Sequence, residues 1–79
     1  MSENRLRFVK GLLFDLVEFG TDIDAVARNI VDLVDGKFVD RDVLQKMVLG
    51  ELSSVVDPYK QRQVVAVSVK IADYLKGGK

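Results

Sequence analysis

The segment from residue 59 to residue 76 carries more apolar surface than one helix of a small monomer needs. At helical spacing its apolar residues form two neighbouring stripes: Val64, Val67, Ile71 and Leu75 in the first, and Val65, Val69 and Ala72 in the second. One stripe is sufficient for packing in a core. The second requires a central position in a bundle or contact with another protein molecule. The sequence therefore favours association over chemistry.

The same segment also has the alternation of a half-buried strand, because apolar residues at 65, 67, 69 and 71 alternate with smaller or polar ones. A lone strand has no partner to pair with, and residues 37–39 are the only other candidate. We therefore predict a helix here and keep the strand as the alternative.

The rest of the chain divides into helices with recognisable ends. The four predicted helices run from about Asn4 to Phe19, from Thr21 to Gly36, from Asp40 to about Val56, and from Asp57 to Gly77. Connections this short place sequential helices as antiparallel neighbours. The sequence predicts an all-α fold, a compact four-helix domain that covers residues 1–79 as a single unit.

Polar residues at the predicted helix starts are typical N-caps. We expect the Thr21 hydroxyl, the Asp40 carboxylate and the Asp57 carboxylate to accept hydrogen bonds from free amides of the first turn. Pro58 at the first helical position lacks an amide that would have no partner there. Val39 and Leu44 are spaced as a hydrophobic staple around the third helix start.

Composition excludes several classes of function. The 79 residues contain no cysteine and no histidine, which rules out disulfides, thiolate metal sites and the commonest general base. Twelve basic and twelve acidic residues cancel, and a neutral total argues against strong nonspecific binding to nucleic acid. No targeting signal or stretch of about 20 apolar residues is present. We expect a cytoplasmic protein without membrane contact.

Paired aspartates invite a metal hypothesis that the spacing does not support. A calcium loop starting at Asp40 would need a ligand at its fifth position and glycine at its sixth, where Leu44 and Gln45 stand. The pairs Asp22/Asp24 and Asp40/Asp42 lie in first helical turns, where they compensate the helix dipole. We expect no metal and no cofactor.

Glu51 is predicted to project into an apolar face, beside Leu44 and Val48. Such a carboxylate could act as an acid or base, but no nucleophile, histidine or second carboxylate accompanies it. We expect a structural ion pair with Arg62, Lys60 or a basic residue of the first helix. Together with the absence of glycine-rich phosphate loops, this predicts a protein that is not an enzyme and has no small-molecule substrate. Gly11 and Gly50, within helices, are expected to allow close helix crossing.

The predicted partner-binding surface combines the outer side of the third helix with the second stripe of the fourth. Its five residues are Leu49, Leu52, Val56, Val65 and Val69. A continuous apolar patch of this kind predicts a homodimer or another protein partner. The function predicted from the sequence is therefore a protein–protein interaction module, a self-associating regulatory or adaptor subunit.

The alternative is a small nucleic-acid-binding regulator of helix-turn-helix type. In it the third predicted helix would present Arg41, Gln45 and Lys46 to base edges. Asp40 and Asp42 weaken this interpretation because they would point negative charge at phosphates. A membrane-surface role for the first helix is also weak, since Asp15 and Glu18 lie on its polar face.

Overall fold

The computed structural model describes residues 2–33 and 40–77, and all regular elements in these ranges are helical. The main helices are α1 (Ser2–Leu13), α2 (Ile23–Asp32), α3 (Arg41–Ser53) and α4 (Gln61–Ala72); η1 (Pro58–Lys60) is a 3₁₀ turn before α4, and η2 (Asp73–Gly77) is a π-helical turn after it. The predicted all-α four-helix class is confirmed. Residues 64–72 are helical, so the strand alternative is wrong.

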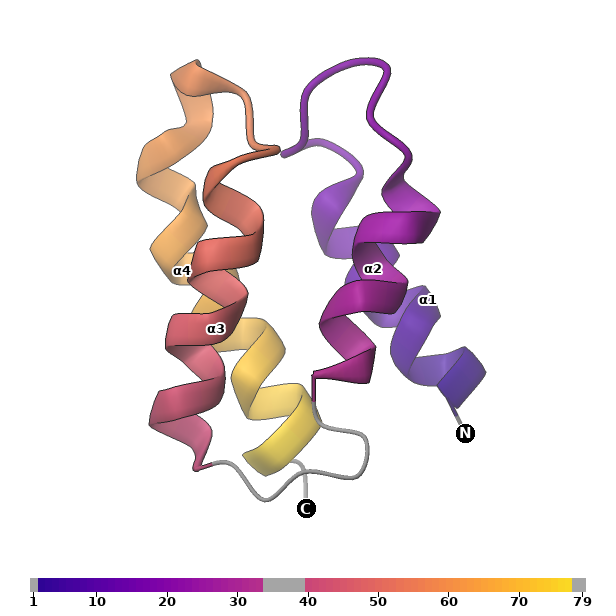
Figure 1. Ribbon diagram of the computed structural model, residues 1–79, viewed down its shortest axis with the longest axis vertical. Helices are drawn as coiled ribbons and strands as arrows, with labels where there is room; N and C mark the ends of the chain where they lie inside the picture. Colours follow the sequence, from indigo (N-terminus) through magenta and orange to yellow (C-terminus); the bar gives the residue numbers. More distant parts are fainter. Residues whose placement is uncertain (1, 34–39, 78–79) are drawn as a thin grey trace.

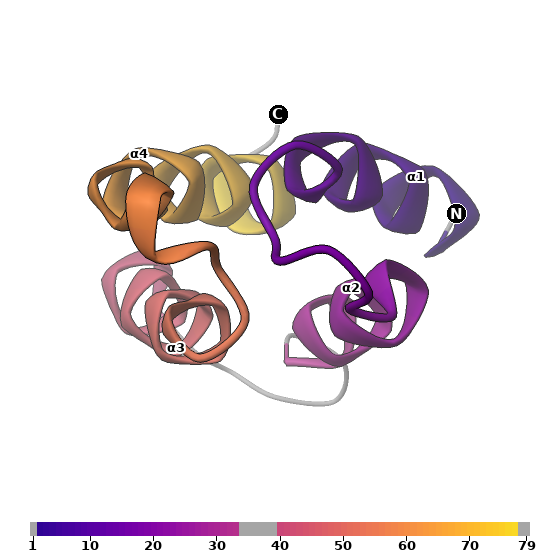
Figure 2. The same ribbon diagram turned by 90° about the horizontal axis from the view of Figure 1, so that it is seen from above.

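The four helices form two antiparallel hairpins that stand side by side (Figure 1). In the first hairpin α1 packs on α2, and in the second α3 packs on α4. Seen from above, the helices occupy the corners of a four-sided arrangement, with α1 beside α4 and α2 beside α3 (Figure 2). The apolar sides of all four helices face this centre. The resulting molecule measures 32 × 23 × 18 Å.

The core takes its side chains from every helix and from both hairpin connections. Its buried apolar residues are Val9, Leu13, Leu16, Ala27, Ile30, Val31, Leu44, Val48, Leu52, Val56, Val64, Ile71, Ala72 and Leu75. The buried hydroxyl of Ser68 lies in the same interior and has no hydrogen-bond partner within residues 2–33 and 40–77. The first apolar stripe of α4 therefore has the role that its spacing predicts.

The connections of the two hairpins meet at one end of the molecule, where Val17 and Val56 form an isolated antiparallel bridge. The amide of Glu18 donates to the carbonyl of Val55 over 2.9 Å, and the amide of Asp57 donates to the carbonyl of Leu16 over 3.2 Å. We call residues 14–22 together with residues 54–60 the bridged end. The bridge links the two hairpins through backbone hydrogen bonds between their connections.

α1 was predicted to continue to Phe19, and this bridge explains why it ends at Leu13 instead. Backbone groups of residues 16 and 18 pair with residues 55 and 57, so they are unavailable to a continuing helix. Gly20 then adopts φ +93°, a left-handed conformation that suits glycine and turns the chain toward α2. For the same reason α3 ends at Ser53, before the predicted Val56.

The caps are partly as predicted. Asp22, not Thr21, caps α2, since its carboxylate accepts from the amide of Ala25 over 3.1 Å. The Asp57 carboxylate accepts from the amide of Tyr59 over 3.0 Å, and so caps η1 ahead of α4. Asp40 stands at the N-cap of α3, but its side chain makes no capping bond. The predicted stop at Gly36, the loop at 37–39 and the Val39 staple lie outside the described residues.

The prediction that Gly11 and Gly50 allow close helix crossing within the domain is wrong. Both are exposed, and a Cβ atom placed on either would meet nothing within 4 Å. Among the described residues, each therefore faces open space, and packing against them requires neither glycine.

Candidate interaction surfaces

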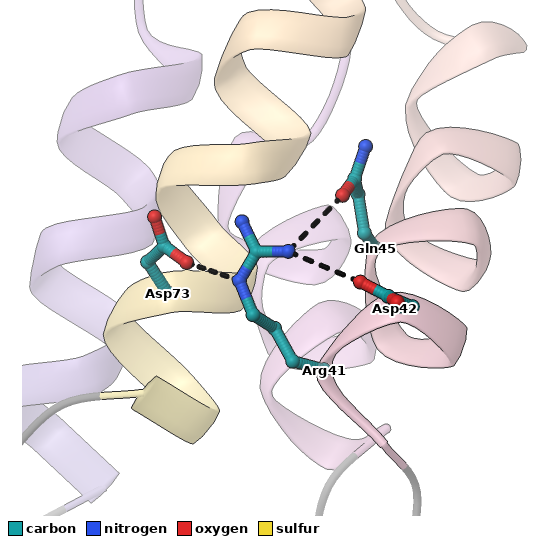
Figure 3. A network of polar contacts seen from close by, with 4 residues as sticks. All are labelled: Arg41, Asp42, Gln45 and Asp73. Atoms are coloured by element: carbon teal, nitrogen blue, oxygen red, sulfur yellow. Dashed lines mark hydrogen bonds and ion pairs between the residues drawn. The ribbon is translucent and has the colours of Figure 1, made fainter.

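Two polar contacts at opposite ends fix the register between α3 and α4. At one end the guanidinium of Arg41 pairs with the carboxylate of Asp73, just beyond α4 (Figure 3). At the other end the side-chain amide of Gln61 donates to the carbonyl of Ser53 over 3.4 Å. Because the helices are antiparallel, both contacts correspond to one register, in which each residue of α3 lies level with a residue of α4. We call this line of contact the α3–α4 seam.

Three of the five predicted partner-binding residues belong to this seam. Val65 is 52% exposed, Leu49 and Val69 are half-buried, and the register places Leu49 level with Val65. Leu52 and Val56 do not face outward, because they are only 0% and 2% exposed. Their prediction as surface residues is wrong: Leu52 packs in the core, and Val56 is held in the bridge. The continuous five-residue patch is therefore reduced to a narrow strip.

Arg41 and Gln45 are engaged within the protein (Figure 3). Besides its pair with Asp73, Arg41 lies 3.3 Å from the carboxylate of Asp42 and donates to the Gln45 side-chain oxygen over 3.4 Å. The hydrogen bond between Arg41 and the Asp73 carboxylate raises the pKa of Arg41 above its ordinary value. The helix-turn-helix hypothesis requires Arg41 and Gln45 to face outward toward bases. In the structure, Arg41 pairs with Asp73 across the seam, and the Gln45 side chain accepts from Arg41 within α3.

Among the described residues, the three most exposed aromatic side chains lie at the bridged end. Phe14 is 72% exposed, Phe19 is 106% exposed and Tyr59 is 95% exposed. Phe14 and Phe19 belong to the first connection and Tyr59 to the second, so the bridge brings the three residues to one end of the molecule. Exposed aromatic side chains at one end of a small domain are typical of an interaction site.

The cluster was not predicted from the sequence because the first helix was expected to continue to Phe19, whereas α1 ends at Leu13. One available signal was Phe14, which lies outside the stripe formed by Leu6, Val9 and Leu13 at helical spacing. An aromatic residue off the apolar face of a helix is exposed unless another element covers it. Here nothing within the described residues does.

A hollow of about 380 Å³ opens at the bridged end beside Phe14 and Phe19. Its apolar wall includes Phe14, Val17, Phe19 and Ile23, and carboxylates of Asp15, Glu18 and Asp57 stand among its lining residues. The one ammonium group in the lining, that of Lys60, donates to the backbone carbonyl of Asp15. The bridged end is thus aromatic with an acidic border.

A second charged cluster joins α1 to α2. Asp24 lies 2.6 Å from Nε of Arg28 and 3.2 Å from Nζ of Lys10. The hydrogen bond from Arg28, followed by that from Lys10, holds the pKa of Asp24 below its ordinary value of 3.8. All three side chains are well exposed, so the cluster orients the hairpin and contributes little to its stability.

The remaining chemical candidates are not assembled into a site. Glu51 is exposed, and its prediction as a buried, paired acid is wrong because α3 turns Leu44, Val48 and Leu52 inward instead. Within residues 2–33 and 40–77, no three acidic side chains come close enough to hold a metal ion. No helix in the same ranges is both long enough and apolar enough to cross a bilayer.

Comparisons with protein-family models, curated proteins and solved structures find no match to this chain.

Proposed function

We propose that this protein is a non-enzymatic protein–protein interaction module, a self-associating regulatory or adaptor subunit, and that it binds through the bridged end. The observation that carries the proposal is the exposure of Phe14, Phe19 and Tyr59 at one end of the molecule. Aromatic residues dominate binding energy at protein interfaces, where they fill pockets on the partner. The core of this domain is complete without them.

The bridged end also has a backbone that is held in place, which favours binding. The bridge between Val17 and Val56, with its two flanking hydrogen bonds, ties the connections to each other. A surface held in this way loses little conformational freedom when it meets a partner. The acidic border adds electrostatic selection, since it favours basic surfaces and disfavours acidic ones.

Nucleic-acid binding is less well supported than protein binding. The carboxylates of Asp15, Glu18 and Asp57 border the most exposed aromatic residues, where they would repel phosphates. Arg41, the first residue proposed to read bases, is paired with Asp73.

The experiment replaces Phe14, Phe19 and Tyr59 together with serine. Because these side chains are exposed, we expect the helical circular dichroism and Tm to change little. Association, measured by sedimentation velocity up to about 1 mM and by cross-linking to proteins of the source cell, should be lost. Val43→Ser removes an exposed apolar residue from α3 and is the matched control. Unchanged association in the triple variant, or a salt-dependent shift of DNA mobility by the wild type, would overturn the proposal.

A further inference from the structure

The outer face of α1 has an order of residues that is symmetrical about Gly11. Arg7 and Asp15 stand four positions before and after it and carry opposite charges, whereas Phe8 and Phe14 stand three positions before and after it. All five residues are exposed. A second α1 laid antiparallel across the first at Gly11 would therefore meet an opposite charge and an aromatic ring at the matching positions.

The backbone keeps a helical course for a few residues beyond α1, which places Phe14 and Asp15 on the same face as Gly11. Beyond the end of α1, the amide of Phe14 still donates to the carbonyl of Lys10 over 3.0 Å, and the amide of Val17 donates to that of Leu13 over 3.1 Å. These are helical spacings, so Phe14 and Asp15 continue the turn that carries Gly11. Residues three and four apart on such a path lie on one face.

Within the described residues, these side chains are available for an external partner. Arg7 and Asp15 take part in none of the ion pairs there, although the Asp15 carbonyl accepts from Lys60. The ring of Phe8 is positioned by stacking on Tyr74, with centroids 4.1 Å apart and planes inclined by 16°. Both rings remain partly exposed.

Gly11 is the second independent observation. Glycine within a helix is unfavourable relative to alanine, and the open space around its Cα shows that packing inside this domain does not require it. A crossing helix from outside would require it, since only glycine lets two backbones approach without a side chain between them.

We infer that a second copy of this chain packs on the outer face of α1, with the two α1 helices antiparallel and crossing at Gly11. Arg7 of each copy faces Asp15 of the other, and Phe8 of each faces Phe14 of the other. The inference rests on the proposed function and names the partner of Phe14 as a second copy. A parallel arrangement is disfavoured because it places Arg7 beside Arg7 and Asp15 beside Asp15. The antiparallel one is self-complementary, as a two-fold interface must be.

A charge-reversal cycle tests this arrangement in the full chain. Arg7→Glu and Asp15→Arg should each weaken the dimer about tenfold or more, because every substitution acts twice across the two-fold axis. The double variant re-forms both pairs with reversed polarity and should recover most of the wild-type affinity. Lys46→Glu, on the exposed side of α3, is the control and should leave the affinity within about twofold.

Gly11→Gln gives a second test with opposite effects on two measurements. The substitution should raise the Tm by a few degrees, about 4 °C, through better helix propensity, and it should weaken the dimer by placing a side chain at the crossing. Gly50→Gln, at an equally open glycine of α3, should raise the Tm in the same way without changing association.

The outcomes separate this inference from the proposed function. A dimer that ignores both charge reversals and Gly11→Gln, but is weakened when Phe14, Phe19 and Tyr59 become serine, overturns the α1 arrangement and leaves the interaction module standing. A wild type that is monomeric at about 1 mM would overturn both this arrangement and the self-association in the proposed function, leaving only binding to a different protein. Recovery of affinity in the double charge variant supports the α1 arrangement.

Discussion

The two hairpins place their surplus apolar residues differently. In the second hairpin, the shorter connection at residues 54–60 lets α4 pack along α3, so most of that surplus lies in the core or along the seam. In the first hairpin, α1 ends early and the longer connection at residues 14–22 carries Phe14 and Phe19 into solvent. The residue at which a helix ends therefore decides whether its last apolar residues are buried, whatever the pattern within it.

The largest expected effect contrasts one apolar residue from each hairpin. Leu52→Ala should lower the free energy of unfolding by about 3 kcal/mol, because it leaves a cavity in a fully packed site. Phe19→Ala should change it by less than about 0.5 kcal/mol, since that ring is wholly exposed. Urea denaturation followed by circular dichroism measures both. Similar losses in the two variants would contradict the burial described for the hairpins.

A second contrast uses one glycine from each hairpin. Gly20 has φ +93°, so Gly20→Ala should destabilise the protein by about 1–2 kcal/mol and disturb the connection that carries Phe19. Gly50 lies in a helix with open space around it, so Gly50→Ala should stabilise by about 0.5–1 kcal/mol. Thermal denaturation separates the two signs. A stabilised Gly20→Ala would show that the first connection does not need a left-handed residue.

Ser68 tests the packing of the second hairpin from inside. Its hydroxyl is fully buried without a partner, so Ser68→Ala should stabilise the protein by about 1 kcal/mol and raise the Tm by about 4–8 °C. Ala66→Ser, which adds a hydroxyl to an exposed position of the same helix, is the matched control and should have a small effect. A destabilised Ser68→Ala would indicate that the hydroxyl is satisfied in solution.

The smallest effect concerns acid stability in the first hairpin. The pKa of Asp24 is lowered in the folded state by Arg28 and then Lys10, so its contribution is present above the ordinary value of 3.8. That contribution is lost as the pH falls through the lower folded pKa. Asp24→Asn should therefore reduce the loss of Tm on acidification below about pH 4, and high salt should mask the difference. Glu51→Gln, an exposed acid, is the control; an equal change in both variants would contradict the pairing.

The sequence was sufficient for the fold class because helix periodicity and the cap at Asp57 are local signals. It was insufficient for the end of α1, which depends on hydrogen bonds between residues far apart in the chain, such as Glu18 with Val55. The predicted rotation of the third helix about its axis was wrong for a related reason. Both Glu51 and Leu52 fit an apolar face at helical spacing, and only packing against α4 decides which one is buried.

The candidate surface was predictable only in part. Val65 is exposed, as its place in the second apolar stripe predicts, because each helix of a four-helix arrangement is covered by its neighbours on only part of its surface. Of the exposed group, only Phe14 had a signal in the sequence; its grouping with Phe19 and Tyr59 was not predictable, because the bridge brings two connections to one end.

One measurement on two double variants compares the two hairpins as binding surfaces. Sedimentation equilibrium would measure self-association of the variant Phe14→Ser with Phe19→Ser and of the variant Val65→Ser with Val69→Ser. We predict that the first pair weakens association about tenfold or more while the second leaves it within about twofold. The reverse result, with association lost in the Val65/Val69 variant and kept in the Phe14/Phe19 variant, would place the partner on the α3–α4 seam and contradict the account.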